Sequence, residues 1–145
     1  MKRIFPIVGL ALLMVLMTGV LIVAAAPTPP ATPNVTFALV QGLPSTMNIG
    51  ETYTTIVKVT SDSEFNWAAA RASFQYPGKG VVAAQGGGGE HEGTATEALL
   101  EVSYTAKTDT SKMPNGEDIV YLVVGVRFKN GYVASEQFQF NVTVP

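Results

Sequence analysis

Polar and apolar residues alternate along several short segments of the chain, and this period decides the fold class. The clearest segments are 53–60, 100–106 and 137–144, in which every second residue is apolar or β-branched. Successive side chains of a strand point to opposite faces, so a period of two predicts strands with one buried and one solvated face. Residues 34–145 are therefore predicted to be all-β, as an antiparallel sandwich of two sheets with about seven strands.

Turn residues divide the predicted strands from one another. Ser61–Glu64 is predicted to be a loop that precedes a strand over residues 65–76. Met113–Gly116 fits a type I turn, because proline suits its second position. Asn130-Gly131 lies between two apolar runs and predicts a two-residue hairpin turn with positive φ.

Three short motifs indicate a family. Asn48-Ile49-Gly50-Glu51-x-Tyr53 leads into the second strand, Trp67 lies in the third, and Met113-Pro114 with Tyr121 forms a proline, turn and tyrosine element before the sixth. With these motifs the domain resembles the bacterial and archaeal immunoglobulin-like or fibronectin-III-like modules of surface and secreted proteins. The resemblance implies an immunoglobulin-like β-sandwich that acts in adhesion, scaffolding or recognition, and it implies no particular ligand.

The first residues of the chain are typical of exported proteins. Two basic residues precede Ile4–Ala26, a stretch without charge that is long enough to span a bilayer core as a helix. Residues 1–26 are therefore predicted to be a signal peptide or a signal-anchor transmembrane helix, which would bind the membrane through residues 4–26 if uncleaved. Residues 27–33 contain four prolines and predict a short extended linker. The domain that follows is expected to be extracytoplasmic, either membrane-anchored or secreted.

Charge and cysteine content exclude several classes of function. The chain has 9 basic and 11 acidic residues, and two of the basic residues precede the apolar stretch. The remainder is acidic and has no basic stripe, so we expect no nucleic-acid partner. The chain contains no cysteine, which excludes disulfides, iron–sulfur clusters and a cysteine nucleophile.

The only histidine, His91, lies between Glu90 and Glu92 at the end of a glycine run that follows Gln85. A phosphate-binding loop needs a helix after its glycines, and here strand-like residues follow. Neighbouring side chains of a strand point to opposite faces, so the trio is poorly placed to share one metal ion. We interpret the stretch as a flexible, solvated loop between two strands, and we expect no cofactor, no metal site and no enzymatic activity.

The predicted function is that of a non-enzymatic, extracytoplasmic immunoglobulin-like module that contacts a protein or a glycan. The expected contact surface combines the outer face of the strand over 119–128 with the glycine stretch, and its members are Val120, Leu122, Val124, Gln85, Glu90, His91 and Glu92. The main alternative is a pilin-like or envelope structural subunit that assembles through its N-terminal helix. Further alternatives are a metal-dependent activity that uses His91, and a calcium site in the acidic segments 61–64 or 109–118.

Overall fold

The computed structural model describes residues 30–76, 80–82, 88–107, 109–111 and 113–145. The chain divides into two compact units, Met1–Ala31 and Thr32–Pro145, and all of the described strands belong to the second. These strands are β1 (Val35–Gln41), β2 (Thr52–Tyr76), β3 (Gly80–Val82), β4 (Gly89–Thr105), β5 (Asp118–Phe128) and β6 (Val133–Val142), and a 3₁₀ turn, η1 (Pro114–Gly116), precedes β5. They form one antiparallel sheet of order β1-β2-β5-β6, with β3 and β4 also paired to β2.

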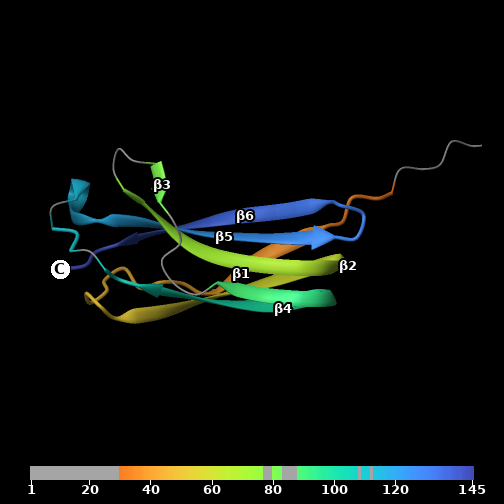
Figure 1. Cartoon of the computed structure of the whole chain (residues 1–145), viewed down its shortest axis with the longest axis horizontal. Coiled ribbons are helices and arrows are strands. Elements are labelled where there is room, and N and C mark those ends of the chain that lie inside the picture. Colours follow the sequence, from red (N-terminus) through yellow and green to blue (C-terminus); the bar gives the residue numbers. More distant parts are fainter. Residues whose placement is uncertain (1–29, 77–79, 83–87, 108, 112) are drawn as a thin grey trace, which may run out of the picture. The chain divides into compact units, whose positions relative to one another are not determined.

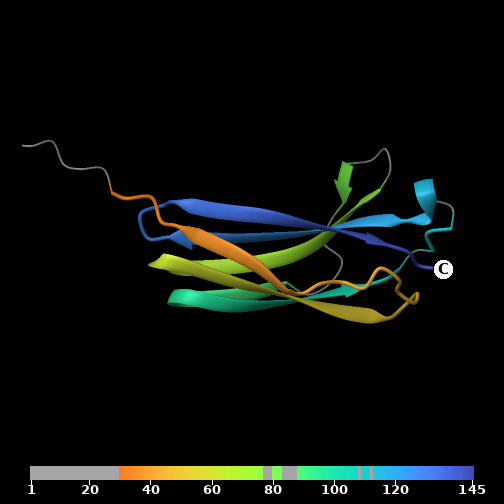
Figure 2. The same cartoon turned by 180° about the vertical axis from the view of Figure 1, so that it is seen from behind.

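The long strand β2 gives this sheet its curvature. Its 25 residues run outward to about Thr60 and return from Phe65, and Figures 1 and 2 show the bend at one end of the domain. Before the bend β2 pairs with β1 and with the second part of β4, and after it β2 pairs with β5 and with the first part of β4. The sheet therefore curls into a half-barrel whose two halves face each other across the core.

The predicted sandwich of two sheets and about seven strands is wrong, because the described residues form six strands in one curled sheet. The reason lies at Ser61–Glu64, which is part of β2 and not a separate loop. Ser61 is paired with Val35 of β1, and Asp62 N–H donates to Asn34 O at 3.2 Å. Asn34 N–H in turn donates to the Asp62 carboxylate at 3.0 Å. The segment before β1 thus keeps this polar stretch extended, and two predicted strands become one.

The expectation of an N-terminal transmembrane helix is also corrected. The described part of the chain contains no α-helix, and none of its residues forms a helix long and apolar enough to cross a membrane. Residues 4–26, on which this helix was expected, lie outside the described ranges.

The core lies between the two halves of the sheet. The predicted inward faces of 53–60, 100–106 and 137–144 are confirmed, and they contribute the buried or half-buried side chains Tyr53, Thr55, Val57, Val59, Leu100, Val102, Tyr104, Ala106, Phe138, Phe140, Val142 and Val144. Phe65 fills the core at the bend: it is 0% exposed, and its ring packs edge-on against Phe128 with centroids 6.4 Å apart. Full burial of an apolar side chain stabilises a fold by about 1.5–3 kcal/mol, so Phe65 makes a contribution of this order at the bend.

The motif before β2 closes a turn through its side chains. Glu51 N–H donates to Asn48 O at 3.1 Å, and Gly50 has a φ of +82°, which glycine adopts without strain. The Tyr53 hydroxyl donates to Glu51 Oε2 at 2.7 Å and accepts from Asn48 N–H at 3.0 Å. The Tyr53 hydroxyl and the Asn48 amide lower the pKa of Glu51, since both donate to its carboxylate. The motif therefore has a structural role in this protein.

Two predicted turns differ in type from the observed ones. Asn115 has φ 62° and ψ 6°, a left-handed conformation that a type I turn does not contain. In the β5–β6 hairpin, Gly131 N–H donates to Phe128 O at 3.0 Å, and Phe128 N–H donates to Tyr132 O at 2.9 Å. Only Gly131 of this turn has a positive φ. The hairpin is therefore a three-residue loop with a glycine bulge, and not the predicted two-residue turn.

Backbone pairs outside the named strands tie one end of the half-barrel together. Thr46 forms a parallel bridge with Thr143, and Met47 N–H donates to Thr143 O at 2.9 Å. Buried Thr110 N–H donates to Val144 O, and Val144 N–H donates to the Thr110 hydroxyl oxygen, both at 2.9 Å. The segment after β1 and the segment after β4 are thereby both fixed to the end of the chain.

Candidate binding surface around Trp67

The structure places the outer face of β5 on its odd-numbered residues. Val120, Leu122 and Val124, which are predicted contact residues, are each 0% exposed and contribute to the core. This corrects the prediction for these three, because a buried side chain offers no contact surface. Val123, which is 44% exposed, and Arg127 lie on the outer face instead.

Glu90, His91 and Glu92 lie within β4, where a flexible loop was expected. They are paired with residues 67–69 of β2 in reverse order. β4 starts at Gly89, so this glycine does not prevent strand pairing. Gln85, the remaining predicted contact residue, lies outside the described residues.

The strand turns the members of this trio to different sides. Glu90 and Glu92 are exposed, whereas His91 is half-buried and packs edge-on against Phe65, with ring centroids 6.1 Å apart. Among the residues that the structure describes, no three histidine, aspartate or glutamate side chains are grouped so that they could hold a metal ion. His91 therefore contributes to packing at the bent end of the core.

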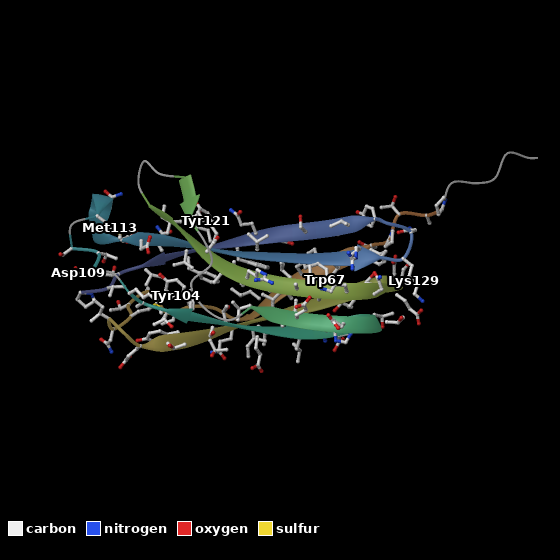
Figure 3. All side chains as sticks on the ribbon, in the orientation of Figure 1. Trp67, Tyr104, Asp109, Met113, Tyr121 and Lys129 are labelled. Carbon is white, nitrogen blue, oxygen red and sulfur yellow. The ribbon has the colours of Figure 1, made fainter. Side chains whose placement is uncertain are left out.

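Trp67 is held between an acid and a base on the outer face of β2. Its indole Nε1–H donates to a carboxylate oxygen of Glu90. The guanidinium carbon of Arg127 lies 5.6 Å from the centroid of the indole ring, within the range of a cation–π interaction. Figure 3 shows Trp67 on the returning part of β2, between β4 and β5. These two contacts restrain a half-exposed aromatic side chain in one position.

The register of the sheet gives the direction in which the indole lies. Trp67 is paired with Arg127 of β5, whereas Glu90 is paired with Ala69, two residues further along β2. To reach Glu90, the indole must extend along β2 over Ala69. This explains why Ala69 is only 7% exposed although it shares the outer face with Trp67. The arrangement is an aromatic platform on the sheet, with a carboxylate bound to its Nε1–H and a guanidinium over its ring.

The platform belongs to a larger surface across β2, β5 and β6. Arg71 is paired with Val123, and Val123 is paired with Gln137 of β6, so the three residues form one row across the outer face, and the Arg71 side chain lies against Gly88, just before β4. Arg71 and Gln137 are both exposed. We call this surface the Trp67 face and define it by Trp67, Arg71, Glu90, Val123, Arg127 and Gln137.

Sequence reasoning missed this surface, although a signal was present. In residues 65–76 Trp67 and Arg71 are four residues apart, so they share a face of any strand. An arginine is almost never fully buried without a partner, which indicates that this face is solvated. The same rule applied to Arg127 assigns the odd-numbered residues of β5 to the outside.

A second polar site is a buried carboxyl group at the start of β5. Asp118 is 6% exposed, no described residue forms a hydrogen bond with its Oδ1, and its Oδ2 lies 3.5 Å from the Tyr104 hydroxyl. Burial raises the pKa of Asp118, and the backbone N–H of Ile119 and the Tyr104 hydroxyl oppose this only in part. Figure 3 shows Tyr104 towards the end of the domain that is opposite to Lys129, away from Trp67.

Asp118→Asn is expected to remove a pH-dependent component of stability. Because folding raises the pKa of Asp118, the folded protein retains a proton that the unfolded chain releases. The free energy of unfolding of the native protein should therefore fall as the pH rises from the ordinary aspartate pKa through the raised one, and change no further above it. Asparagine does not titrate, so the variant should gain stability over the native protein as the pH rises to 7. Urea unfolding at a series of pH values measures this, and parallel pH profiles would contradict it.

Comparisons with known proteins leave the chain without an assigned family. No family model matches it, and no curated protein matches it by sequence. Three solved structures show a distant similarity. Spo0M, a sporulation control protein from Bacillus subtilis, has a TM-score of 0.48 at 15% identity, with 79% of this chain and 51% of that chain covered. A DUF4466 family protein from Parabacteroides merdae has a TM-score of 0.44 at 11% identity, with 77% of this chain and 45% of that chain covered. Murine CRIg, an immunoglobulin-like domain, has a TM-score of 0.42 at 7% identity, with 79% of this chain and 99% of that chain covered.

The chain spans about half the length of the first two of these proteins. All three TM-scores are below 0.5 and no identity exceeds 15%, so the functional argument rests on the Trp67 face.

Proposed function

We propose that this protein is a non-enzymatic recognition module that acts outside the cytoplasm and contacts its partner through the Trp67 face. The observation that carries the proposal is the restrained position of Trp67, half-exposed on the outer sheet face and held by Glu90 and Arg127. Tryptophan and arginine are the residues that most often dominate binding energy. A side chain that is fixed before binding loses less conformational entropy when a partner docks.

The location outside the cytoplasm is proposed from the first residues of the chain. Two basic residues followed by an uncharged apolar stretch are typical of an export signal. Protease treatment of intact cells and sequencing of the mature N-terminus test the location. We expect the domain to be digested by external protease or to be found in the medium. A protected domain in the cytoplasmic fraction would overturn the location.

Trp67→Ala is expected to weaken binding of the exported protein to isolated cell envelopes at least tenfold. The variant removes the aromatic platform and leaves Arg127 without its ring contact, and a central tryptophan commonly contributes about 2 kcal/mol or more to binding. A cosedimentation assay gives the affinity. Leu99→Ala is the control, because Leu99 is 62% exposed but belongs to β4, where it is paired with Lys58 before the bend of β2. Equal loss in both variants would contradict a specific role of the Trp67 face.

A further inference from the structure

Two arginines on the Trp67 face have no acidic partner in the part of the chain that the structure describes. Neither Arg71 nor Arg127 forms an ion pair with a described residue, whereas Lys58 on the other half of the sheet pairs with Glu97 at 2.8 Å. Both guanidinium groups belong to exposed residues, and each offers a planar set of donors that matches a carboxylate. The Trp67 face is thus equipped to bind anions in a domain whose overall charge is negative.

The spacing of the two arginines indicates a ligand with more than one charge. Arg71 is paired with Val123, and Arg127 lies four residues further along β5. At about 3.4 Å per residue, this places the two residues about 14 Å apart along the strand direction. A chain with repeated carboxylates spans this separation, whereas a single carboxylate does not.

The surroundings of the arginines favour a saccharide over other anionic partners. The Trp67 ring carries the Arg127 guanidinium over it and is still half-exposed, so a sugar ring can contact its open part, and the Gln137 amide next to Val123 can donate to and accept from hydroxyl groups. Extended peptides usually add to the edge of a sheet, whereas Arg71 and Arg127 lie on two inner strands. A broad anionic membrane would also face Glu90 and Glu92, which are exposed on β4 beside the platform.

We propose that the Trp67 face binds an acidic oligosaccharide, with its carboxylates on Arg71 and Arg127 and a sugar ring against Trp67. This inference rests on the proposed recognition function and names its class of ligand. The other outward residues of β6 are the uncharged side chains Val133, Ser135, Gln139 and Asn141, and the Glu117 carboxylate lies at the Asn141 end of the strand, where it accepts from the Asn141 amide at 3.0 Å.

Calorimetry with the exported protein tests the inference, and the probes are tetragalacturonic acid, neutral cellotetraose, tetraglutamate peptide and phosphatidylglycerol vesicles. We expect tetragalacturonic acid to bind best and its affinity to fall with added salt. Arg71→Gln and Arg127→Gln should each reduce that affinity at least tenfold. Lys107→Gln is the matched control, since it removes the same charge from an exposed residue two positions after β4 and should leave the affinity unchanged.

Three results would overturn the inference: no binding of tetragalacturonic acid, equal binding of cellotetraose, or preferential binding of the peptide or the vesicles. Equal loss of affinity in Lys107→Gln would also overturn it, because the interaction would then depend only on net charge. If the oligosaccharide does not bind but Trp67→Ala still reduces envelope binding, the ligand class is wrong and the recognition function stands. If neither effect is observed, both proposals fail.

Discussion

Gly89→Ala is expected to destabilise the domain by about 3 kcal/mol or more, which for a chain of this size removes a large part of its stability. A Cβ at this position would lie 2.6 Å from Glu101 O and 2.8 Å from Glu101 N. Both are backbone atoms of the second part of β4, so they cannot rotate away as the end of a side chain can. The variant can form only if β4 or its pairing with β2 is displaced. Urea unfolding followed by tryptophan fluorescence gives the free energy of unfolding.

Gly125→Ala is the matched control for this variant. It also adds one methyl group to a glycine in a strand, but the nearest heavy atom to the new Cβ is Ala134 O at 3.6 Å, an ordinary contact. Gly125 has no positive φ either, so alanine is expected to change stability by no more than about 0.5 kcal/mol or to raise it slightly. If both variants unfold at the same urea concentration, the close approach at Gly89 does not determine the fold of β4.

Phe65→Ala is expected to cost about 3–5 kcal/mol, the range for removal of a fully buried aromatic ring. Phe65 is 0% exposed at the bend of β2, where it is paired with both Ala95 and Phe128. Its ring also packs against His91. The variant therefore leaves a cavity at the place where the two halves of the sheet are joined, and thermal unfolding should show one transition at a much lower temperature.

Phe65→Leu separates the effect of the cavity from the effect of any change at this position. Leucine refills most of the volume, so the variant should recover most of the lost stability. If leucine is as damaging as alanine, the edge-on contacts with Phe128 and His91, and not the filled volume, hold the bend together.

The alternation of residues predicted which segments are strands but not how they join. Ser61–Glu64 has the composition of a loop, and it is extended because Asn34, 28 residues before Asp62, supplies hydrogen-bond partners for it. A local pattern cannot contain such a partner. The prediction of a flexible loop at the glycine stretch failed because it also lacked a distant partner. Gly89 is needed for close packing against the Glu101 backbone and not for flexibility.

The candidate site was predictable only in part. The segment 119–128 reads as apolar on both faces in the sequence, so Val120, Leu122 and Val124 were placed on the wrong side. Arg127 is the one charged residue near the end of that segment, and it sets the side that faces solvent. The contact between Trp67 and Glu90 was not predictable, because it depends on the register between β2 and β4, and a bulge changes this register.

The bend in β2 also has a kinetic consequence. Because β2 and β4 each belong to both halves of the sheet, neither half has a complete set of strands until the other has formed. The pairings that complete the core join residues far apart in the chain, as Thr52 with Thr105 and Asp118 with Val142 show. Loop closure must therefore precede most of the favourable contacts, which places such a domain among the slow folders, on a scale of about milliseconds to seconds. The chain thus remains open to misassociation until both halves have closed together.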